Sequence, residues 1–299
     1  KTFSDAVGTT RSLTLIDIDE SVTFSSAVVA TNINVAGNKT ATFSDNLTGA
    51  VTSNGGMLFN HTGAGATVNI TYTAGGADII RVEDSQDNVA PAVVTFSNDI
   101  TATSLRVGAS NGTKGGRALF QGTVTIPTIS VVGGDHADED STATFNDDLT
   151  ATIVLDDNTG DAKIIFATAN NATITGTING SATTEGTLQI TGATKTFASA
   201  IGTTQDLTLI DIDGTSIFNA AVSATDIDND GTATFKSNVT AATANDGTLT
   251  LTPNGNNNIT HTGAISGTGT LNAVEADEGA VNSVTFSTTV AAATFNVGS

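Results

Sequence analysis

The sequence predicts an all-β fold, specifically a parallel β-helix (β-solenoid) with rungs of about 20 residues. Three observations lead to this prediction. A short unit recurs along the chain, apolar and polar residues alternate within each unit, and no segment keeps the 3.6-residue period of a helix. The abundance of Thr, Asn, Gly and Val, with only 3 prolines, is typical of many short strands joined by small-residue turns.

The recurring unit reads T-F-x-x-x-(V/I/L)-x-(A/T), followed by a second apolar pair and a polar or glycine-containing turn. Its phenylalanines are Phe3, Phe24, Phe43, Phe96, Phe120, Phe145, Phe197, Phe218, Phe235 and Phe286. Many neighbours among them are about twenty residues apart, which is the length of one solenoid rung. A phenylalanine at a fixed place in each rung predicts an internal ladder of rings, with polar Asn and Thr ladders at the turns.

The period inside a unit is two residues, as in a strand with one buried face and one wet face. In the segment 94–107, Phe96 is expected to point inward and Arg106 outward, with a turn between the two strands. A corner is expected near Leu15-Ile16. Bends this frequent suit a coil in which each rung buries little alone and stacking buries a continuous core.

A longer repeat lies above the short one. The sequence KTFSDAVGTTRSLTLIDID at Lys1–Asp19 matches KTFASAIGTTQDLTLIDID at Lys195–Asp213, about 190 residues later. We therefore assign residues 1–194 to a first super-repeat and residues 195–299 to a partial second one, continuous with the first. About fifteen rungs are expected at this spacing.

Tandem β-sandwich domains are the alternative architecture, which expects a repeat nearer 90–100 residues. The twenty-residue unit argues against sandwiches. The stretches Asn60–Asp78 and Ala264–Asn282 nevertheless do not follow the unit, and they are long enough to hold larger segments outside regular rungs.

The net charge of the chain limits the classes of partner that it can bind. It has 30 acidic and 10 basic residues, a net charge of −20, and no cysteine. Such a surface repels nucleic acid and anionic membranes, and it attracts divalent cations. The lack of cysteine excludes disulfides, thiolate metal sites and a cysteine nucleophile. No apolar run is long enough to predict membrane insertion.

Acidic residues at turns are the best candidates for a metal site. Asp226, Asp228 and Asp230 precede Gly231, matching the first half of a D-x-D-x-D-G calcium loop. Alternation places these three carboxylates on one side of the chain, where oxygen ligands suit Ca²⁺. The match is partial, since position twelve of such a loop would be Ser237 rather than glutamate.

Two further acidic clusters follow the same pattern. The first holds Asp135, Asp138, Glu139 and Asp140, and the second holds Asp156, Asp157 and Asp161. We predict bound Ca²⁺ at one or more of the clusters, with Asp135, Asp138 and Asp140 as the second candidate set. The alternative is that all these carboxylates are solvated turn residues.

The sequence predicts no enzymatic activity. Its histidines are His61, His136 and His261, and two of them open the same tripeptide, His-Thr-Gly, in the two super-repeats. His61 and His261 are therefore expected to occupy equivalent positions. A duplicated residue along an array is more typical of a structural role than of catalysis. The absence of tryptophan argues against the aromatic platforms of sugar-cleaving clefts.

The T-F units, together with NITHTGAISGTGTLNAV at Asn258–Val274, resemble the β-strand repeats of bacterial surface proteins. These include autotransporter passenger domains, rickettsial-type outer-surface adhesins and surface-layer proteins. The resemblance implies a secreted, right-handed β-helical stalk or coat. It carries over no functional residues.

Three classes of function remain. The first is a non-enzymatic extracellular structural protein, a subunit or segment of a coat, sheath or filament that self-associates laterally or head to tail. The second is an adhesin stalk or passenger that presents a glycan or host-surface ligand site elsewhere. The third is a phage or surface fibre that degrades polysaccharide. Lys1 begins a unit and Ser299 closes one, so either the array continues or its ends stack on other molecules.

Overall fold

The computed structural model describes residues 1–61, 66–74, 79–84, 92–255, 257–274 and 282–298. Within these residues the chain is all-β without a helix, and it divides into two compact units, Lys1–Lys163 and Ile164–Ser299. Their parallel strands form a β-solenoid of about 12 turns with rungs of about 22 residues. The predicted fold is confirmed, with longer and therefore fewer rungs than expected, and the parallel pairing excludes the β-sandwich alternative.

The strands of the first unit succeed one another at short intervals along the chain. They are β1 (Thr2–Phe3), β2 (Leu13–Ile18), β3 (Val22–Phe24), β4 (Val28–Val35), β5 (Thr40–Phe43), β6 (Leu47–Ser53), β7 (Gly56–His61), β8 (Ala66–Ala74), β9 (Ile79–Asp84), β10 (Val93–Phe96), β11 (Ile100–Thr101), β12 (Ser104–Val107), β13 (Arg117–Phe120), β14 (Val124–Val132), β15 (Ser141–Phe145) and β16 (Leu149–Asp156).

Strand β17 (Ala162–Thr168) spans the boundary between the units. The second unit continues with β18 (Ala172–Thr175), β19 (Ile178–Gly180), β20 (Thr187–Gly192), β21 (Lys195–Phe197), β22 (Leu207–Ile212), β23 (Thr215–Phe218), β24 (Val222–Asn229), β25 (Thr232–Phe235), β26 (Val239–Asn245), β27 (Thr248–Leu251), β28 (Ile259–Thr262), β29 (Ile265–Ser266), β30 (Thr270–Val274), β31 (Val284–Phe286) and β32 (Thr294–Gly298).

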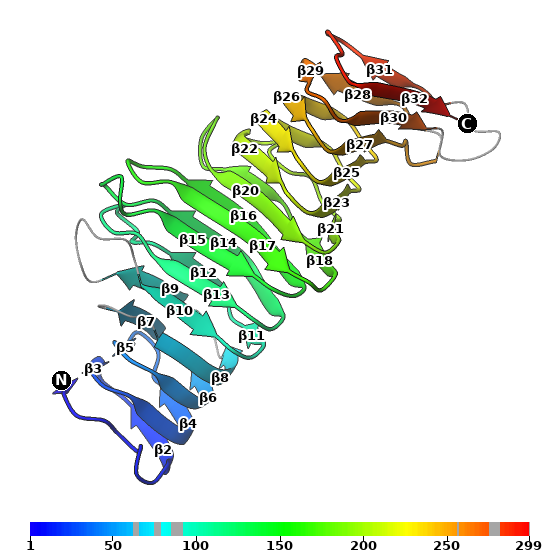
Figure 1. Cartoon of the computed structure of the whole chain (residues 1–299). Helices are drawn as coiled ribbons and strands as arrows, with labels where there is room; N and C mark the ends of the chain where they lie inside the picture. Colours follow the sequence, from blue (N-terminus) through cyan, green and yellow to red (C-terminus); the bar gives the residue numbers. More distant parts are fainter. Residues whose placement is uncertain (62–65, 75–78, 85–91, 256, 275–281, 299) are drawn as a thin grey trace. The chain divides into compact units, whose positions relative to one another are not determined.

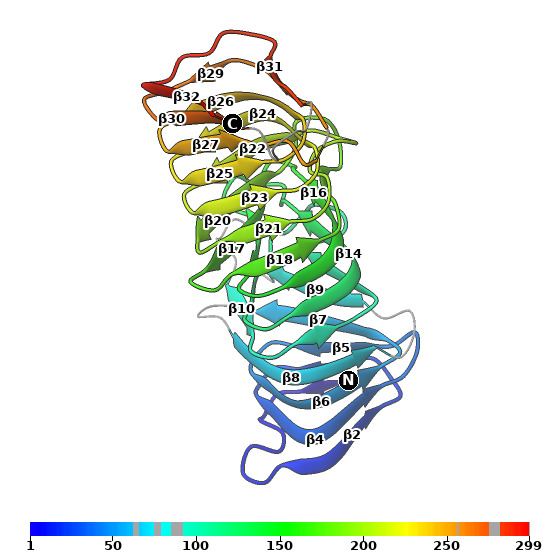
Figure 2. The same ribbon diagram turned by 90° about the vertical axis from the view of Figure 1, so that its right-hand side faces the viewer.

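Each strand pairs in register with the strands one rung before and after it. In the first unit, Phe3 pairs with Phe24, and Phe24 pairs with Phe43. In the second unit, Phe197 pairs with Phe218, and Phe218 pairs with Phe235. Figure 1 shows the resulting stacks, and Figure 2 shows β2, β4, β6 and β8 following one another along one face of the first unit.

The buried side chains follow the two-residue period that the sequence predicts. In the segment 94–107, Val94, Phe96 and Leu105 are buried, while Arg106 lies on the outer surface, as expected. Asn and Asp side chains at the turns accept backbone hydrogen bonds from the next rung. Asn46 Oδ1, for example, accepts from the Thr67 amide at 2.7 Å. The rungs are thus joined by apolar packing inside and by amide and carboxylate hydrogen bonds at the corners.

The phenylalanine ladder is confirmed only in separate runs. Phe3, Phe24, Phe43 and Phe59 stack face to face with ring centroids 5.2, 5.3 and 5.8 Å apart. The next contact differs, because Phe59 meets Phe96 edge to face at 84°. In the second unit, Phe166 meets Phe197 in the same way at 83° before the Phe197–Phe218–Phe235 run begins.

The reason is a change in the strand that carries the phenylalanine. Phe59 of β7 pairs with Val82 of β9, whereas Phe96 of β10 pairs with Val68 of β8. The T-F motif therefore moves from one stack of strands to another. The segment from Phe59 to Phe96 is longer than one rung, so the motif returns at a different place on the coil. The expected fixed position in every rung is wrong beyond a single run.

The pairing also corrects the predicted equivalence of His61 and His261. His61 belongs to β7, whereas His261 of β28 pairs with Val239. In the first unit the residue corresponding to Val239 is Leu47, and Leu47 pairs with Val68. His261 thus takes the place of Val68, because the matching tripeptides lie on different strands of the coil.

Candidate functional site

The acidic residues Asp226, Asp228 and Asp230 lie on or directly after β24, and their side chains point outward. The intervening Ile227 and Asn229 are buried. The expectation that alternation places the three carboxylates on one side of the strand is therefore confirmed. They project from the wall of the second unit toward solvent.

Carboxylates of neighbouring rungs extend this row. Asp228 pairs with Asp211 of β22, and Gln189 Nε2 donates hydrogen bonds to Asp211 at 2.9 Å and to Asp213 at 3.2 Å. Burial, followed by the charges of Asp230, Asp246 and Asp213, raises the pKa of Asp228 above its usual value. This acidic ladder, defined as Asp211, Asp213, Asp228, Asp230 and Asp246, concentrates negative charge on one strip of the second unit.

Hydrogen bonds already occupy part of the acidic ladder. The backbone N–H and the hydroxyl of Thr268 donate to Asp246 Oδ1, each at 2.7 Å, and they lower the pKa of Asp246. Over the described ranges, no group of three or more His, Asp or Glu side chains converges as a metal site would require. The ladder can therefore attract cations through its field without presenting a closed coordination shell.

The second candidate set lies in the loop between β14 and β15. Asp140 Oδ1 accepts a hydrogen bond from the Asp161 amide at 3.0 Å, and Asp135 lies 3.8 Å from His136. Asp138 is exposed, whereas Glu139 is buried. Asp135 and Asp140 contact different partners, and among the described residues no three such side chains gather as a metal site, so the loop does not bring Asp135, Asp138 and Asp140 together.

The two histidines whose side chains are described, His136 and His261, occupy different environments. The side chain of His61 lies outside the described residues, and His136 is exposed beside Asp135. His261 is buried, with its Nε2 atom 3.1 Å from the Thr243 hydroxyl. Burial lowers the pKa of His261, and a backbone contact at Gly263 partly opposes that shift. A ring enclosed in this way has no access to a dissolved substrate.

Apolar side chains are exposed on the outermost rung edges of both units. Phe3, Leu13 and Leu15 are 48%, 42% and 49% exposed around a shallow hollow in the first unit. In the second unit, Phe295 and Val297 are 50% and 77% exposed. Each of these side chains lies on a strand that is paired along one edge. The other edge of the strand is open and can pair with another rung.

The residues Lys195–Asp213 indicate what covers such an edge. They repeat Lys1–Asp19 almost letter for letter, yet Phe197 and Ile210 are buried, whereas their counterparts Phe3 and Ile16 are exposed and half-buried. The preceding rung supplies the cover, since Phe197 pairs with Ile174 and Ile210 pairs with Leu188. The same sequence thus forms an exposed edge in one unit and an interior rung in the other.

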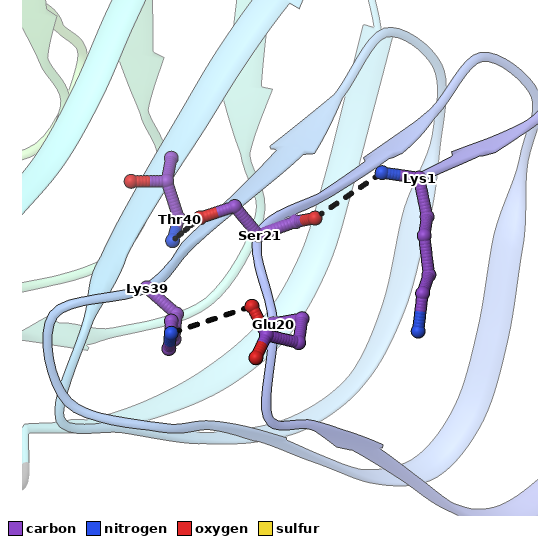
Figure 3. A network of polar contacts seen from close by, with 5 residues as sticks. All are labelled: Lys1, Glu20, Ser21, Lys39 and Thr40. Atoms are coloured by element: carbon purple, nitrogen blue, oxygen red, sulfur yellow. Dashed lines mark hydrogen bonds and ion pairs between the residues drawn. The ribbon is translucent and has the colours of Figure 1, made fainter.

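One feature of the first unit was not predicted from the sequence, namely a basic hollow. It is lined by Gly37, Asn38, Lys39, Thr40, Asn54, Gly55, Gly56, Ile79, Arg81 and Arg106. Its rim is fixed by contacts between rungs. Lys39 Nζ lies 3.4 Å from Glu20 Oε2, and the Thr40 amide donates to Ser21 Oγ at 3.1 Å (Figure 3).

The sequence signal for the basic hollow is weak because its residues come from several rungs. Arg81 and Arg106 are separated by a full rung in the chain but are direct pairing partners. Finding them would have required the register across the irregular stretch that follows Phe59.

No helix in the described part of the chain is long and apolar enough to cross a membrane. No protein-family model matches the chain, and comparisons with the curated proteins and with the solved structures find no match.

Proposed function

We propose that this chain is a non-enzymatic extracellular structural protein, a segment or subunit of a surface coat, sheath or filament that extends by stacking rung on rung. The observation that carries the proposal is the pair of near-identical segments, Lys1–Asp19 and Lys195–Asp213. One is covered by a further rung, and the other offers the same apolar edge to solvent.

The occupant we propose for the exposed edge is a rung of a second copy of this chain. The open edge of β32 carries Phe295 and Val297, whose apolar side chains can cover Leu13 and Leu15. Parallel strands can then continue their ladder across the contact, satisfying backbone N–H and C=O groups on both edges. Such a contact joins the open edge of the second unit of one molecule to the open edge of the first unit of the next, and a heterologous contact of this kind gives an open assembly when it does not close into a ring.

The character of the outer walls supports a structural role over an adhesive tip or a cleaving fibre. The ladders are mostly Thr, Asn and Asp, and the buried His261 is closed to substrate. An adhesin stalk remains the second candidate, favoured by the resemblance to surface-protein repeats. It differs in requiring no regular self-association.

Analytical ultracentrifugation across a wide range of protein concentrations tests the structural role. Wild-type protein is expected to form oligomers through its open strand edges, visible as filaments by electron microscopy. The variant Leu13→Lys/Leu15→Lys places charges on the exposed edge and is expected to stay monomeric. The matched variant Leu207→Lys would unfold the interior copy instead, so the control is Thr14→Lys on the outer wall. A wild-type protein that is monomeric throughout would favour the adhesin stalk.

We further propose that Ca²⁺ stabilises the assembly through the acidic ladder. Stacked carboxylates repel one another, and a divalent cation relieves that repulsion. If this holds, filaments should loosen when calcium is chelated. Equal filament lengths with calcium and with chelator would oppose the calcium role and leave the structural role standing.

A further inference from the structure

We propose that the basic hollow of the first unit binds the carboxylate of an acidic saccharide, a sugar chain containing uronic acid. This would be a ligand site in addition to the proposed structural role. Two arginines, Arg81 and Arg106, lie on consecutive rungs of the same outer wall and line this hollow.

Arg81 of β9 and Arg106 of β12 are direct pairing partners and both side chains lie on the outer face. Their backbones are therefore one rung, about 4.8 Å, apart. Two guanidinium groups at this spacing repel each other unless an anion lies between or above them. Guanidinium groups bind carboxylates through paired N–H donors, so the arrangement suits a carboxylate ligand.

Of the two arginines, only Arg106 has a carboxylate partner among the described residues. Arg106 Nη2 lies 3.6 Å from Glu83 Oε1, while its buried Nε has no hydrogen-bond partner. For Arg81, the described residues provide neither an ion pair nor a hydrogen bond to the guanidinium. Lys39 adds a third cation, paired with the well-exposed Glu20. Three cations thus line the hollow, and two of them are paired with carboxylates, in a chain whose net charge is −20.

Gly56 provides the room for a ligand. A Cβ atom at this position would lie 3.4 Å from Thr40 Oγ1 and 3.9 Å from Arg81 Nη2, so a side chain would fit but would fill the space beside the guanidinium. With glycine there, the hollow reaches about 520 Å³. That volume is within the range of small-molecule sites and exceeds the need of a single ion.

The second unit contains the same positions without the hollow. Thr40 pairs with Gly56 in the first unit, and Thr232 pairs with Thr248 in the second. Where the first unit stacks Leu58, Arg81 and Arg106, the second stacks Thr250, Asn272 and Asn296.

These asparagines satisfy one another. Asn296 Nδ2 donates to Asn272 Oδ1 at 2.8 Å, and Asn272 Nδ2 donates to Thr250 Oγ1 at 3.3 Å. The solenoid wall is therefore built equally well with neutral residues at these positions. Stacked arginines beside a glycine are therefore not a requirement of the fold, and we attribute them to ligand binding because they line a hollow.

The remaining lining favours a saccharide over an acidic peptide. Asn38, Asn54 and Thr40 offer amide and hydroxyl groups that match sugar hydroxyls, and Ile79 offers one apolar wall. A long polyanion would be repelled by the acidic surface of the chain. A short saccharide that places one carboxylate on the arginines avoids most of that repulsion.

Isothermal titration calorimetry with the whole chain tests this site. The probe is an oligogalacturonate of three to four sugars, with a neutral oligosaccharide of equal length and hexaglutamate as comparisons. Only the oligogalacturonate is expected to bind, and its affinity should fall as salt is raised. Binding of the neutral sugar with equal affinity, tighter binding of hexaglutamate, or no binding at all would overturn the proposal.

Variants locate the binding. Arg81→Asn/Arg106→Asn, which installs the residues of the second unit, is expected to weaken binding at least 10-fold. Gly56→Thr keeps both arginines and fills the hollow, so it should weaken binding by a similar factor even if the double variant folds poorly. Arg11→Asn makes the same charge change on an exposed part of the first unit and should leave binding unchanged. Equal losses from Arg11→Asn and Gly56→Thr would contradict a site in the hollow.

Discussion

The segments Lys1–Asp19 and Lys195–Asp213 have nearly the same sequence in very different surroundings. Phe3 is 48% exposed, whereas its counterpart Phe197 is 1% exposed. Leu13 lies at an open edge, whereas Leu207 is fully buried. The residues are alike, so the difference comes from the rung that covers one copy. Burial in a solenoid is a property of stacking between rungs.

The outer walls of the two units differ in another way, because corresponding positions there carry different residues. The first unit has the basic hollow where the second has an asparagine ladder. The second unit has its own charged strip, the acidic ladder, where Asp228 corresponds to Asn34 of the first. The apolar interior is largely repeated because packing constrains it, and the walls differ more because solvent tolerates many residues.

The largest expected effect is a difference in stability between two phenylalanine variants, one in the closed core and one at the exposed edge. Phe218 stacks between Phe197 and Phe235 with centroid distances of 4.9 and 4.6 Å. Phe218→Ala should destabilise the second unit by about 3–5 kcal/mol, because it leaves a cavity in a closed core. Phe3→Ala should cost about 1 kcal/mol or less, since Phe3 contacts one ring and is half exposed.

Hydrogen exchange measured by mass spectrometry reports each unit separately and can compare the two variants. Protection in β21, β23 and β25 should fall for Phe218→Ala and stay unchanged for Phe3→Ala. Equal losses of stability in the two variants would mean that the edge rung is covered in solution. That outcome would point to self-association at the concentration used.

Much of this interior could be predicted from the sequence, because it depends on local signals. The two-residue period and the recurring T-F unit are enough to place Phe96 inside and Arg106 outside. The shift of the phenylalanine ladder at Phe59 was not predictable, because it depends on the length of an irregular stretch. The same stretch explains why matching tripeptides misaligned His61 with His261.

The surface sites divide in the same way. Asp226, Asp228 and Asp230 belong to one strand, so alternation alone places them on one side. The basic hollow draws on residues from several rungs, among them Lys39, Gly56, Arg81 and Arg106. Its charged side chains lie close together only because of how the rungs are aligned. That alignment of strands could not be read from the sequence.

The next largest effect on stability is expected at a buried pair of asparagines in the second unit, where the first unit has a valine and a serine. Asn229 Nδ2 donates to Asn245 Oδ1 at 2.6 Å, where the first unit pairs Val35 with Ser53. Asn245→Ser should cost about 1–3 kcal/mol, because the buried Asn229 amide loses its acceptor. The double variant Asn229→Val/Asn245→Ser, which copies the first unit, should recover most of that loss.

Urea unfolding of the two single variants and the double variant completes a mutant cycle for this pair. A coupling energy of about 1 kcal/mol or more is expected for groups in direct contact. Independent, additive costs would mean that water replaces the missing amide. They would also mean that the buried Asn–Asn pair and the Val–Ser pair are not interchangeable.

A smaller effect should appear on acidification. Burial lowers the pKa of His261, so the unfolded chain binds a proton more readily than the folded chain. The neutral histidine is fully compatible with folding above pH 6.5, and stability should decline as pH falls below that value. His261→Val, which installs the Val68 equivalent, should cost about 1–3 kcal/mol at pH 7.5, because the buried Thr243 hydroxyl loses its partner, and should remove this decline.

The measurement is the difference in urea midpoint between wild type and His261→Val at pH 7.5 and pH 5.0. Comparing the two proteins cancels the titration of the carboxylates, which both share. A difference that stays constant between the two pH values would show that the His261 ring gains solvent access when it is protonated.

The smallest effect tests the acidic ladder. Because the pKa of Asp228 is raised in the folded chain, its charge is unfavourable at neutral pH, and the related stability is present at low pH and lost as pH rises. Asp228→Asn should therefore stabilise the second unit at pH 7, by about 0.5 kcal/mol or less for a mostly solvated carboxylate. The gain should vanish below the ordinary aspartate pKa.

Asp226→Asn is the matched control, because Asp226 pairs with Leu209 and Ala242 and has no carboxylate as a pairing partner. Thermal unfolding in calcium and in chelator then connects the ladder to the proposed cation. If Ca²⁺ binds there, calcium should raise the unfolding temperature of wild type and Asp226→Asn more than that of Asp228→Asn. The same rise in all three proteins would assign the effect of calcium to general screening of a chain with 20 excess negative charges.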